Sequence, residues 1–163
     1  MKDPSYILSG ANKILYEQNK PREYPIHGTA FLGLFFNDGK VVYSNAGHEI
    51  PFLISSDKGV AALSASPQIA LGIIVDPYYK SYETQLNSGD ILILYTDGLT
   101  DARSHDNQMD FYDSRIIADL REIRENMNGN FKSFSKTLLQ KSLGFSDRKV
   151  PKDDTIVIAI QKS

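Results

Sequence analysis

The distribution of hydrophobic residues along the chain places a buried strand near its centre. Residues 91–95 are five consecutive bulky side chains, whereas a half-exposed strand would alternate apolar and polar positions. The run ends at Thr96, Asp97 and Gly98, so a carboxylate lies where the strand leaves the core. A carboxylate at such a strand end is rigidly held and still reaches solvent, as a metal ligand or a catalytic acid requires. The pattern therefore makes Asp97 the first candidate for chemistry.

Helical periodicity marks three other segments. Asp3-Pro4 is a helix-start signal, and apolar residues recur at helical spacing from there to Glu17. Two further amphipathic helices are predicted, one over 116–127 and one over 131–139, with Asn128-Gly129-Asn130 between them. We interpret all three helices as scaffold.

The middle of the chain is rich in strand signals. Asp38-Gly39 between two strand-like runs predicts a β-hairpin from about Thr29 to Asn45, because both turn residues tolerate the positive φ of a tight turn. Further strands are predicted over 52–54, 60–63 and 78–86. Together with the hairpin, these strands favour an antiparallel meander.

A second β-branched run, Thr155–Ile160, follows the acidic pair Asp153-Asp154 and predicts another buried strand. If it runs antiparallel beside residues 91–95, its entrance lies next to the exit of the central strand, and Asp97 meets the acidic pair. Adjacent carboxylates repel each other unless a cation lies between them, and oxygen ligands suit Mg²⁺ or Mn²⁺. The alternative is a solvated acidic turn, and the residues alone leave both interpretations open.

His48 also has two interpretations. It could be a metal ligand or a proton-transfer group, since imidazole titrates near neutrality. It could instead be a turn histidine whose ring nitrogens bond to the backbone. We favour the turn histidine, because no second histidine or acid stands beside it at ligand spacing.

Composition narrows the class of protein. A chain of 163 residues that is 41% hydrophobic and 23% charged is typical of one globular domain. The net charge of -2 and the pI near 5.9 give no electrostatic reason to expect a nucleic-acid partner. With no cysteine, disulfides and thiolate metal sites are excluded, and no apolar run approaches the length of a membrane span. We therefore expect a soluble, cytoplasmic protein.

Four motifs occur in the order and spacing of a known family: Asn45–Pro51, Ala70–Ile73, Gly89–Arg103 and Asp153–Thr155. With these motifs, the chain resembles the SpoIIE/RsbU-type bacterial serine phosphatases, which are PPM phosphatases related to protein phosphatase 2C. The resemblance covers nearly the whole chain, and its motifs are specific in combination.

The resemblance implies an α+β fold, a PPM-like antiparallel β-sandwich flanked by helices. It implies metal-dependent hydrolysis of phosphoserine or phosphothreonine on a regulatory protein, with two Mn²⁺ or Mg²⁺ ions as cofactors. By resemblance, Asp97 and Asp153 are the catalytic, metal-binding acids. Gly98 and Asp154 match cofactor-binding positions, Gly98 as a sharp turn after the ligand and Asp154 as the second candidate acid. The implied partner is a STAS-type anti-sigma-factor antagonist in its phosphorylated form.

The chain also departs from the family pattern. Nothing in residues 1–27 resembles the family's N-terminal strands, which carry further metal-binding acids. We therefore expect residues 1–163 to be the larger, C-terminal part of a single phosphatase domain, with about half of the dinuclear site absent and no activity by itself. The alternatives are a non-catalytic pseudophosphatase that binds or regulates a partner, and two copies of the chain that complete each other through exposed sheet edges. Tyr112 in place of the usual glycine and Ala70 in place of proline bear only on local loop geometry.

Overall fold

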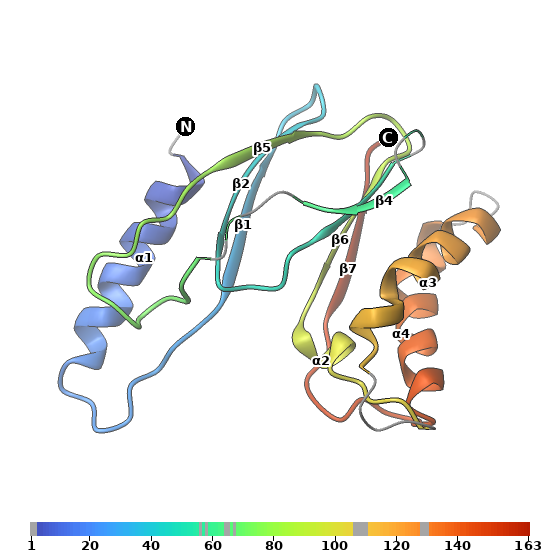
Figure 1. Cartoon of the computed structure of the whole chain (residues 1–163). Helices are drawn as coiled ribbons and strands as arrows, with labels where there is room; N and C mark the ends of the chain where they lie inside the picture. The colour runs from blue at the N-terminus through green and yellow to red at the C-terminus, as the bar shows by residue number, and fades with distance from the viewer. Residues whose placement is uncertain are drawn as a thin grey trace. The chain divides into compact units, whose positions relative to one another are not determined.

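The computed structural model describes residues 3–55, 57, 59–63, 66, 68–105, 111–127 and 131–163. The chain divides into two compact units, Met1–Ile50 with Ser64–Leu86 and Pro51–Leu63 with Asn87–Ser163. Each unit contains one antiparallel sheet and at least one α-helix (Figure 1). The predicted α+β class with antiparallel sheets and flanking helices is confirmed. No helix among the described residues is both long enough and apolar enough to cross a lipid bilayer.

The first unit holds a three-stranded antiparallel sheet in the order β1-β2-β5. Its elements are α1 (Pro4–Asn19), β1 (Ala30–Phe35), β2 (Lys40–Ala46) and β5 (Tyr82–Gln85). The strands β1 and β2 are the predicted hairpin, and the turn between them has Gly39 at a φ of 88°. A side chain there would also lie 2.2 Å from the Leu86 carbonyl oxygen, so both the backbone angle and the space require glycine.

Helix α1 begins where the sequence predicts and is fixed by two buried asparagines. The Asn12 amide donates to the Ile74 carbonyl at 3.0 Å and accepts from the Gly72 N–H at 2.8 Å. The Asn19 amide donates to the Ile26 carbonyl at 2.6 Å and accepts from the N–H of the same residue at 2.9 Å. These hydrogen bonds satisfy loop backbone groups that burial would otherwise leave unpaired. The helix consequently extends to Asn19, beyond the predicted end at Glu17.

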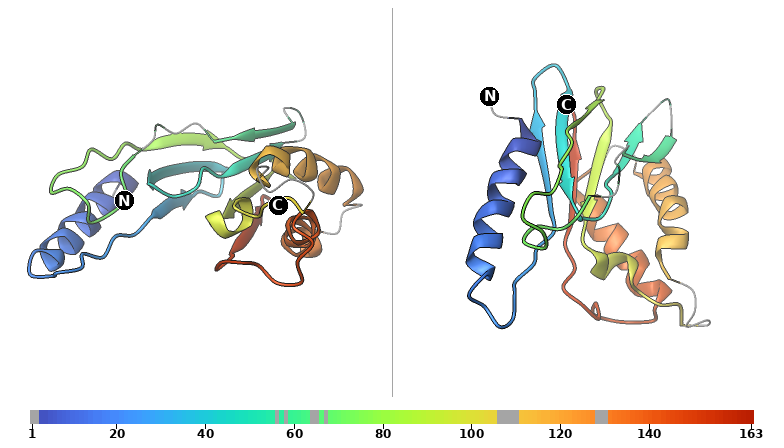
Figure 2. Two further views of the ribbon diagram at one scale, coloured as in Figure 1. Left: turned by 60° about the horizontal axis from the view of Figure 1, so that its bottom comes forward. Right: turned by 60° about the vertical axis from the view of Figure 1, so that its left-hand side comes forward.

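The second unit holds a four-stranded antiparallel sheet in the order β4-β3-β6-β7. Its strands are β3 (Phe52–Ser55), β4 (Gly59–Ala62), β6 (Ile91–Tyr95) and β7 (Val157–Gln161). Its helices are α2 (Asp97–Thr100), α3 (Asp113–Asn126) and α4 (Phe134–Phe145), with a 3-10 turn at Phe131–Ser133 before α4. Figures 1 and 2 show α3 and α4 side by side against one face of the sheet. The main core of the unit lies between this face and the two helices.

The central strand β6 is as buried as its composition predicts. Ile91, Leu92 and Ile93 have no exposed surface. On one side β6 pairs with β3, and on the other it pairs with β7 in an antiparallel register that places Tyr95 opposite Val157. The exit of β6 therefore lies beside the entrance of β7, as expected from the sequence.

Two predictions about the strands are wrong. The middle of the chain is not a meander, because β3 and β4 join β6 in the second sheet while β5 pairs with β2 in the first. Strand β7 is not the buried strand that the sequence predicts, since Ile156 before it and Ile158 within it are 56% and 49% exposed. As an edge strand it is packed by helices only on the face that carries Val157 and Ala159. The predicted turn at residues 128–130 lies outside the described residues.

Candidate functional site

Thr96 joins the end of β6 to the segment that leads into β7. Its N–H donates to the Ile156 carbonyl at 3.1 Å, and its hydroxyl accepts from the Ile156 N–H at 3.0 Å. The same hydroxyl donates to the Asp154 carbonyl at 3.1 Å. One side chain therefore continues the ladder past the last strand pair and fixes the two acidic segments to each other.

Asp97 is the first residue of α2 and is exposed. Its carbonyl accepts from the Asp101 N–H at 2.8 Å and from the Thr100 hydroxyl at 3.2 Å, which closes the single turn of α2. Within the described part of the chain, its carboxylate has no hydrogen-bond or ion-pair partner. The predicted ligand is thus held by its backbone, while its side chain remains open to a ligand from solvent.

Gly98 allows the two acidic segments to approach closely. A Cβ at this position would lie 2.6 Å from the Asp154 carbonyl oxygen and 2.7 Å from the Thr155 hydroxyl. The backbone of Gly98 is not in the left-handed region. Close packing therefore requires glycine at this position, whereas its backbone angle does not.

Asp153 and Asp154 are both exposed but differ in what they contact. The Asp153 carboxylate accepts from the Asp154 N–H at 2.7 Å, and the Asp153 carbonyl accepts from the Thr155 hydroxyl at 2.9 Å. Asp154 contributes its carbonyl to Thr96. The segment is thereby ordered as a turn of defined geometry at the entrance of β7.

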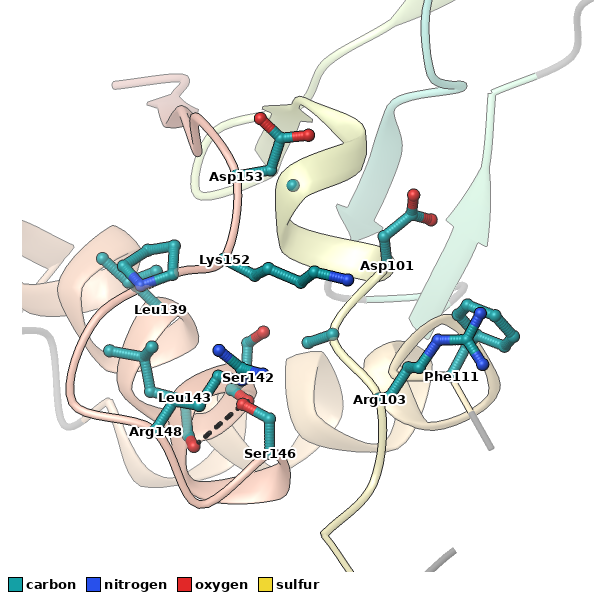
Figure 3. A pocket seen from close by; sticks show the side chains of 13 residues that line it. Asp101, Arg103, Phe111, Leu139, Ser142, Leu143, Ser146, Arg148, Lys152 and Asp153 are labelled. Carbon is teal, nitrogen blue, oxygen red and sulfur yellow. Dashed lines mark hydrogen bonds between the residues drawn. The ribbon is translucent and has the colours of Figure 1, made fainter. Parts of the chain in front are cut away.

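A pocket of about 270 Å³ opens beside Asp153 and Gly98. Figure 3 shows Lys152 extending across it towards Asp101, with Arg148 below. Neither cation was identified as a site residue from the sequence, and neither was Thr96. Its position between a buried strand and a candidate ligand, within the motif Gly89–Arg103, could have indicated Thr96.

The segment around His48 in the first unit is a structural turn. The Asn45 amide accepts from the His48 N–H at 2.7 Å and donates to the His48 carbonyl at 2.8 Å. Gly47 has a φ of 67°, and a Cβ there would lie 2.9 Å from the Ala70 nitrogen. The interpretation of His48 as a turn residue is supported, although its ring nitrogen lies 3.2 Å from the Thr29 hydroxyl and not against the backbone.

The acids at the β6–β7 edge are ligands of the type that a hard divalent cation prefers, but they are too few to complete its coordination. Its candidate ligands are carboxylates, which Mg²⁺ and Mn²⁺ prefer. Across the residues that the structure describes, no three histidines, cysteines or acids lie grouped so that they could hold a metal ion. Asp97 and Asp153 would therefore provide only part of a coordination sphere.

Comparison with known proteins assigns the class and then the family. The fold is that of PP2C-type phosphatase domains. The PP2C phosphatase domain of SpoIIE from Bacillus subtilis, solved with a fragment of its regulatory domain, matches with a TM-score of 0.76 and 20% identity, over 99% of this chain and 44% of that one. The model of the family "Stage II sporulation protein E (SpoIIE)" matches residues 1–163, and the chain belongs to this family.

Two further matches bear on chemistry. The phosphoserine phosphatase RsbU of Bacillus subtilis (strain 168) is 24% identical over 164 residues, which cover 98% of this chain and 45% of RsbU. The chain thus spans less than half the length of this relative. A manganese-presoaked structure of the SpoIIE phosphatase domain from Bacillus subtilis matches with a TM-score of 0.61 and 19% identity, over 82% of this chain and 56% of that one.

Proposed function

We propose that this chain supplies the β6–β7 acidic edge of a metal-dependent protein serine/threonine phosphatase, which hydrolyses phosphoserine or phosphothreonine on a regulatory protein. The observation that carries the proposal is the set of Thr96 hydrogen bonds to Ile156 and Asp154, which hold the exit of β6 against the entrance of β7. Membership of the SpoIIE family and the fold of PP2C-type phosphatase domains support it.

In this proposal Asp97 and Asp153 are the metal ligands, and Asp154 is the second candidate at the entrance of β7. With further ligands that complete its coordination, a divalent ion held by these acids would activate a water molecule and neutralise charge on the phosphoryl group. Gly98 keeps the two segments in close approach, and Thr96 orients them. The manganese-presoaked neighbour supports Mn²⁺ as the first ion to test.

Calorimetric titration with Mn²⁺ tests this assignment. We expect weak binding to the 163-residue chain, lost in Asp97→Asn and in Asp153→Asn, because each substitution removes an anionic oxygen ligand. Glu125→Gln is the matched control, since Glu125 is an exposed acid of α3 in the same unit. Indistinguishable isotherms for the wild type and Asp97→Asn would remove Asp97 from the site.

A second function, a non-catalytic module that binds a phosphoprotein, is favoured by the small number of grouped ligands among the described residues. The two functions predict the same partner chemistry, and we propose a phosphorylated STAS-type anti-sigma-factor antagonist as that partner. Binding that distinguishes phosphorylated from unphosphorylated partner would support both functions. Hydrolysis separates the two functions, because only a phosphatase releases phosphate from the partner.

A further inference from the structure

Strand β7 lies at the edge of the second sheet, with β6 on one side and, among the described residues, no strand on the other. An open edge presents backbone N–H and C=O groups that can pair with another chain, and proteins commonly protect such an edge with charged residues or proline. Residues 155–161 contain neither a charged residue nor a proline. The edge of β7 is therefore suited to pairing with another strand.

The hydrogen bonds to β6 determine which backbone groups of β7 face the open edge. At one end of the segment the Ile156 carbonyl accepts from the Thr96 N–H at 3.1 Å. At the other end the Lys162 N–H donates to the Asp90 carbonyl at 3.0 Å. In an antiparallel pair, residues that bond to one neighbouring strand alternate with residues whose backbone groups turn away from it. The even-numbered residues therefore bond to β6, and the odd-numbered residues of β7 turn their N–H and C=O groups to the open edge.

The side chains of the even-numbered residues form an apolar row on the face of β7 that the helices do not cover. Ile156 and Ile158 are 56% and 49% exposed, and Ile160 continues the row. Val157 and Ala159 instead pack against the core on the helix side. The row is symmetric about Ile158. A second copy of the strand that runs antiparallel to the first would consequently place isoleucine opposite isoleucine at three positions.

Opposite charges lie at equal distances on the two sides of Ile158. Asp154 lies four residues before it and Lys162 four residues after it. Among the described residues, the Asp154 carboxylate has no hydrogen-bond or ion-pair partner, and the Lys162 ammonium donates to the Ser163 carbonyl at 2.7 Å. In an antiparallel pair centred on Ile158, each Asp154 would lie opposite Lys162 of the other copy, and such cross-strand pairs are stabilising. The charges and the apolar row therefore favour the same register.

We propose that two copies of this chain pair through β7, antiparallel and centred on Ile158, so that their four-stranded sheets form one sheet of eight strands. Both copies use the same edge in this two-fold contact, which closes the assembly at a dimer. The pairing does not depend on the proposed function, and it leaves the proposed ligands Asp97 and Asp153 to the metal ion. It assigns Asp154 to Lys162 of the second copy, so each copy contributes a lysine beside the acidic edge of the other.

Disulfide cross-linking tests this pairing directly, because the chain has no cysteine of its own. In a non-hydrogen-bonded antiparallel pair the Cα atoms lie about 4.5 Å apart, which a disulfide can span. We expect Ile158→Cys to form a covalent dimer under mild oxidation. Ile156→Cys should cross-link to Ile160→Cys when the two variants are mixed, and much less to itself. Ile14→Cys is the matched control, because Ile14 in α1 is also an exposed isoleucine, at 63%.

Sedimentation velocity measures the same pairing without a cross-link, and circular dichroism verifies that each variant is folded. We expect a concentration-dependent dimer of the wild type. Ile158→Lys should raise its dissociation constant by about tenfold or more, because two like charges would lie opposite each other, whereas Ile14→Lys should not change it. Asp154→Lys and Lys162→Asp should each raise it by about two- to tenfold, and the double variant should restore it.

A wild type that stays monomeric at millimolar concentration would overturn the pairing, as would Ile158→Cys that cross-links no faster than Ile14→Cys. Ile156→Cys that cross-links to itself as fast as to Ile160→Cys would overturn the register, and so would a double charge variant that is no tighter than the single ones. All of these measurements are made without metal or substrate. Absence of Mn²⁺ binding would therefore count against the proposed phosphatase site and leave the dimer standing.

Discussion

Gly98 connects sequence to function at the scale of one residue. Its missing side chain leaves room for the Asp154 carbonyl oxygen, which would lie only 2.6 Å from a Cβ. We predict that Gly98→Ala lowers the free energy of unfolding by about 1 to 3 kcal/mol, the usual cost of overpacking. The substitution should also weaken Mn²⁺ binding, because it separates the segments that carry Asp97 and Asp153.

Urea unfolding measures the first effect, and Gly144→Ala in α4 is the matched control. Among the described residues, no atom outside the helix's own backbone and the chain neighbours lies within 4 Å of a Cβ at Gly144, so alanine there should leave stability unchanged or raise it through its higher helix propensity. Equal stability of Gly98→Ala and the wild type would contradict the close approach of the two segments.

At this scale the sequence predicted the acids better than the residues that position them. Asp97 and Asp153 were accessible to prediction because each follows or precedes a strongly apolar run. Thr96 and Asn12 were not, because each acts through backbone groups that lie far away in sequence, up to 63 residues in the case of Asn12. The sequence around a polar residue does not indicate which distant backbone group will become its hydrogen-bond partner in the folded protein.

Helices α3 and α4 are joined by a polar network around the buried carboxylate of Asp119. The Tyr112 hydroxyl, beside the start of α3, donates to the Asp119 carboxylate at 2.8 Å, and Asp119 is only 3% exposed. Lys141 of α4 lies 3.4 Å from the same carboxylate and 2.9 Å from that of Glu122. The Tyr112 ring also belongs to the hydrophobic core of the second unit. The network therefore depends on the protons of the Tyr112 hydroxyl and the Lys141 ammonium group, which alkaline solution removes.

The pKa shifts in this network predict a loss of stability at high pH. Burial, followed by the hydrogen bond to Asp119, raises the pKa of Tyr112, and the hydrogen bond to Glu122 raises the pKa of Lys141. A raised pKa stabilises the folded state fully below the unfolded pKa, which is about 10 for both residue types. Above about pH 10 the unfolded chain loses these protons first, and stability falls by about 1 kcal/mol per pH unit for a single group.

Tyr112→Phe removes one titrating group from the network and tests this prediction. We expect the free energy of unfolding of this variant to decline less steeply above about pH 10 than that of the wild type. Tyr78→Phe is the control, because Tyr78 is 84% exposed. Parallel alkaline profiles for Tyr112→Phe and the wild type would show that Tyr112 ionises equally in both states.

The sequence predicted the elements that have strong local patterns. It predicted only some of the pairings between strands. The buried run of β6 and the hairpin at Asp38-Gly39 are local signals, and both are present. The distribution of the strands between the two sheets does not follow from local patterns, since β2 pairs with β5 across more than thirty residues. The apolar run of β7 predicted a buried strand, although only one of its faces is packed by helices.

For the whole molecule, family resemblance predicted more than periodicity could. Motifs that are weak alone identify the SpoIIE family in combination, and the family model matches the entire chain. The α+β architecture follows from that match. The metal site does not follow as directly, because its proposed ligands are exposed acids whose grouping depends on how separate segments meet.

Catalysis requires more metal ligands than the 163-residue chain groups together among its described residues. We expect its Mn²⁺-dependent hydrolysis of p-nitrophenyl phosphate to equal that of Asp97→Asn, because the described residues include no group of three metal-ligating side chains. One or two carboxylates hold a divalent ion weakly, and such an ion neither positions a water molecule nor clamps the phosphate. Turnover that exceeds the Asp97→Asn level but is retained in Glu125→Gln would show that the chain itself completes the site, and the interpretation as a non-catalytic module would then be wrong.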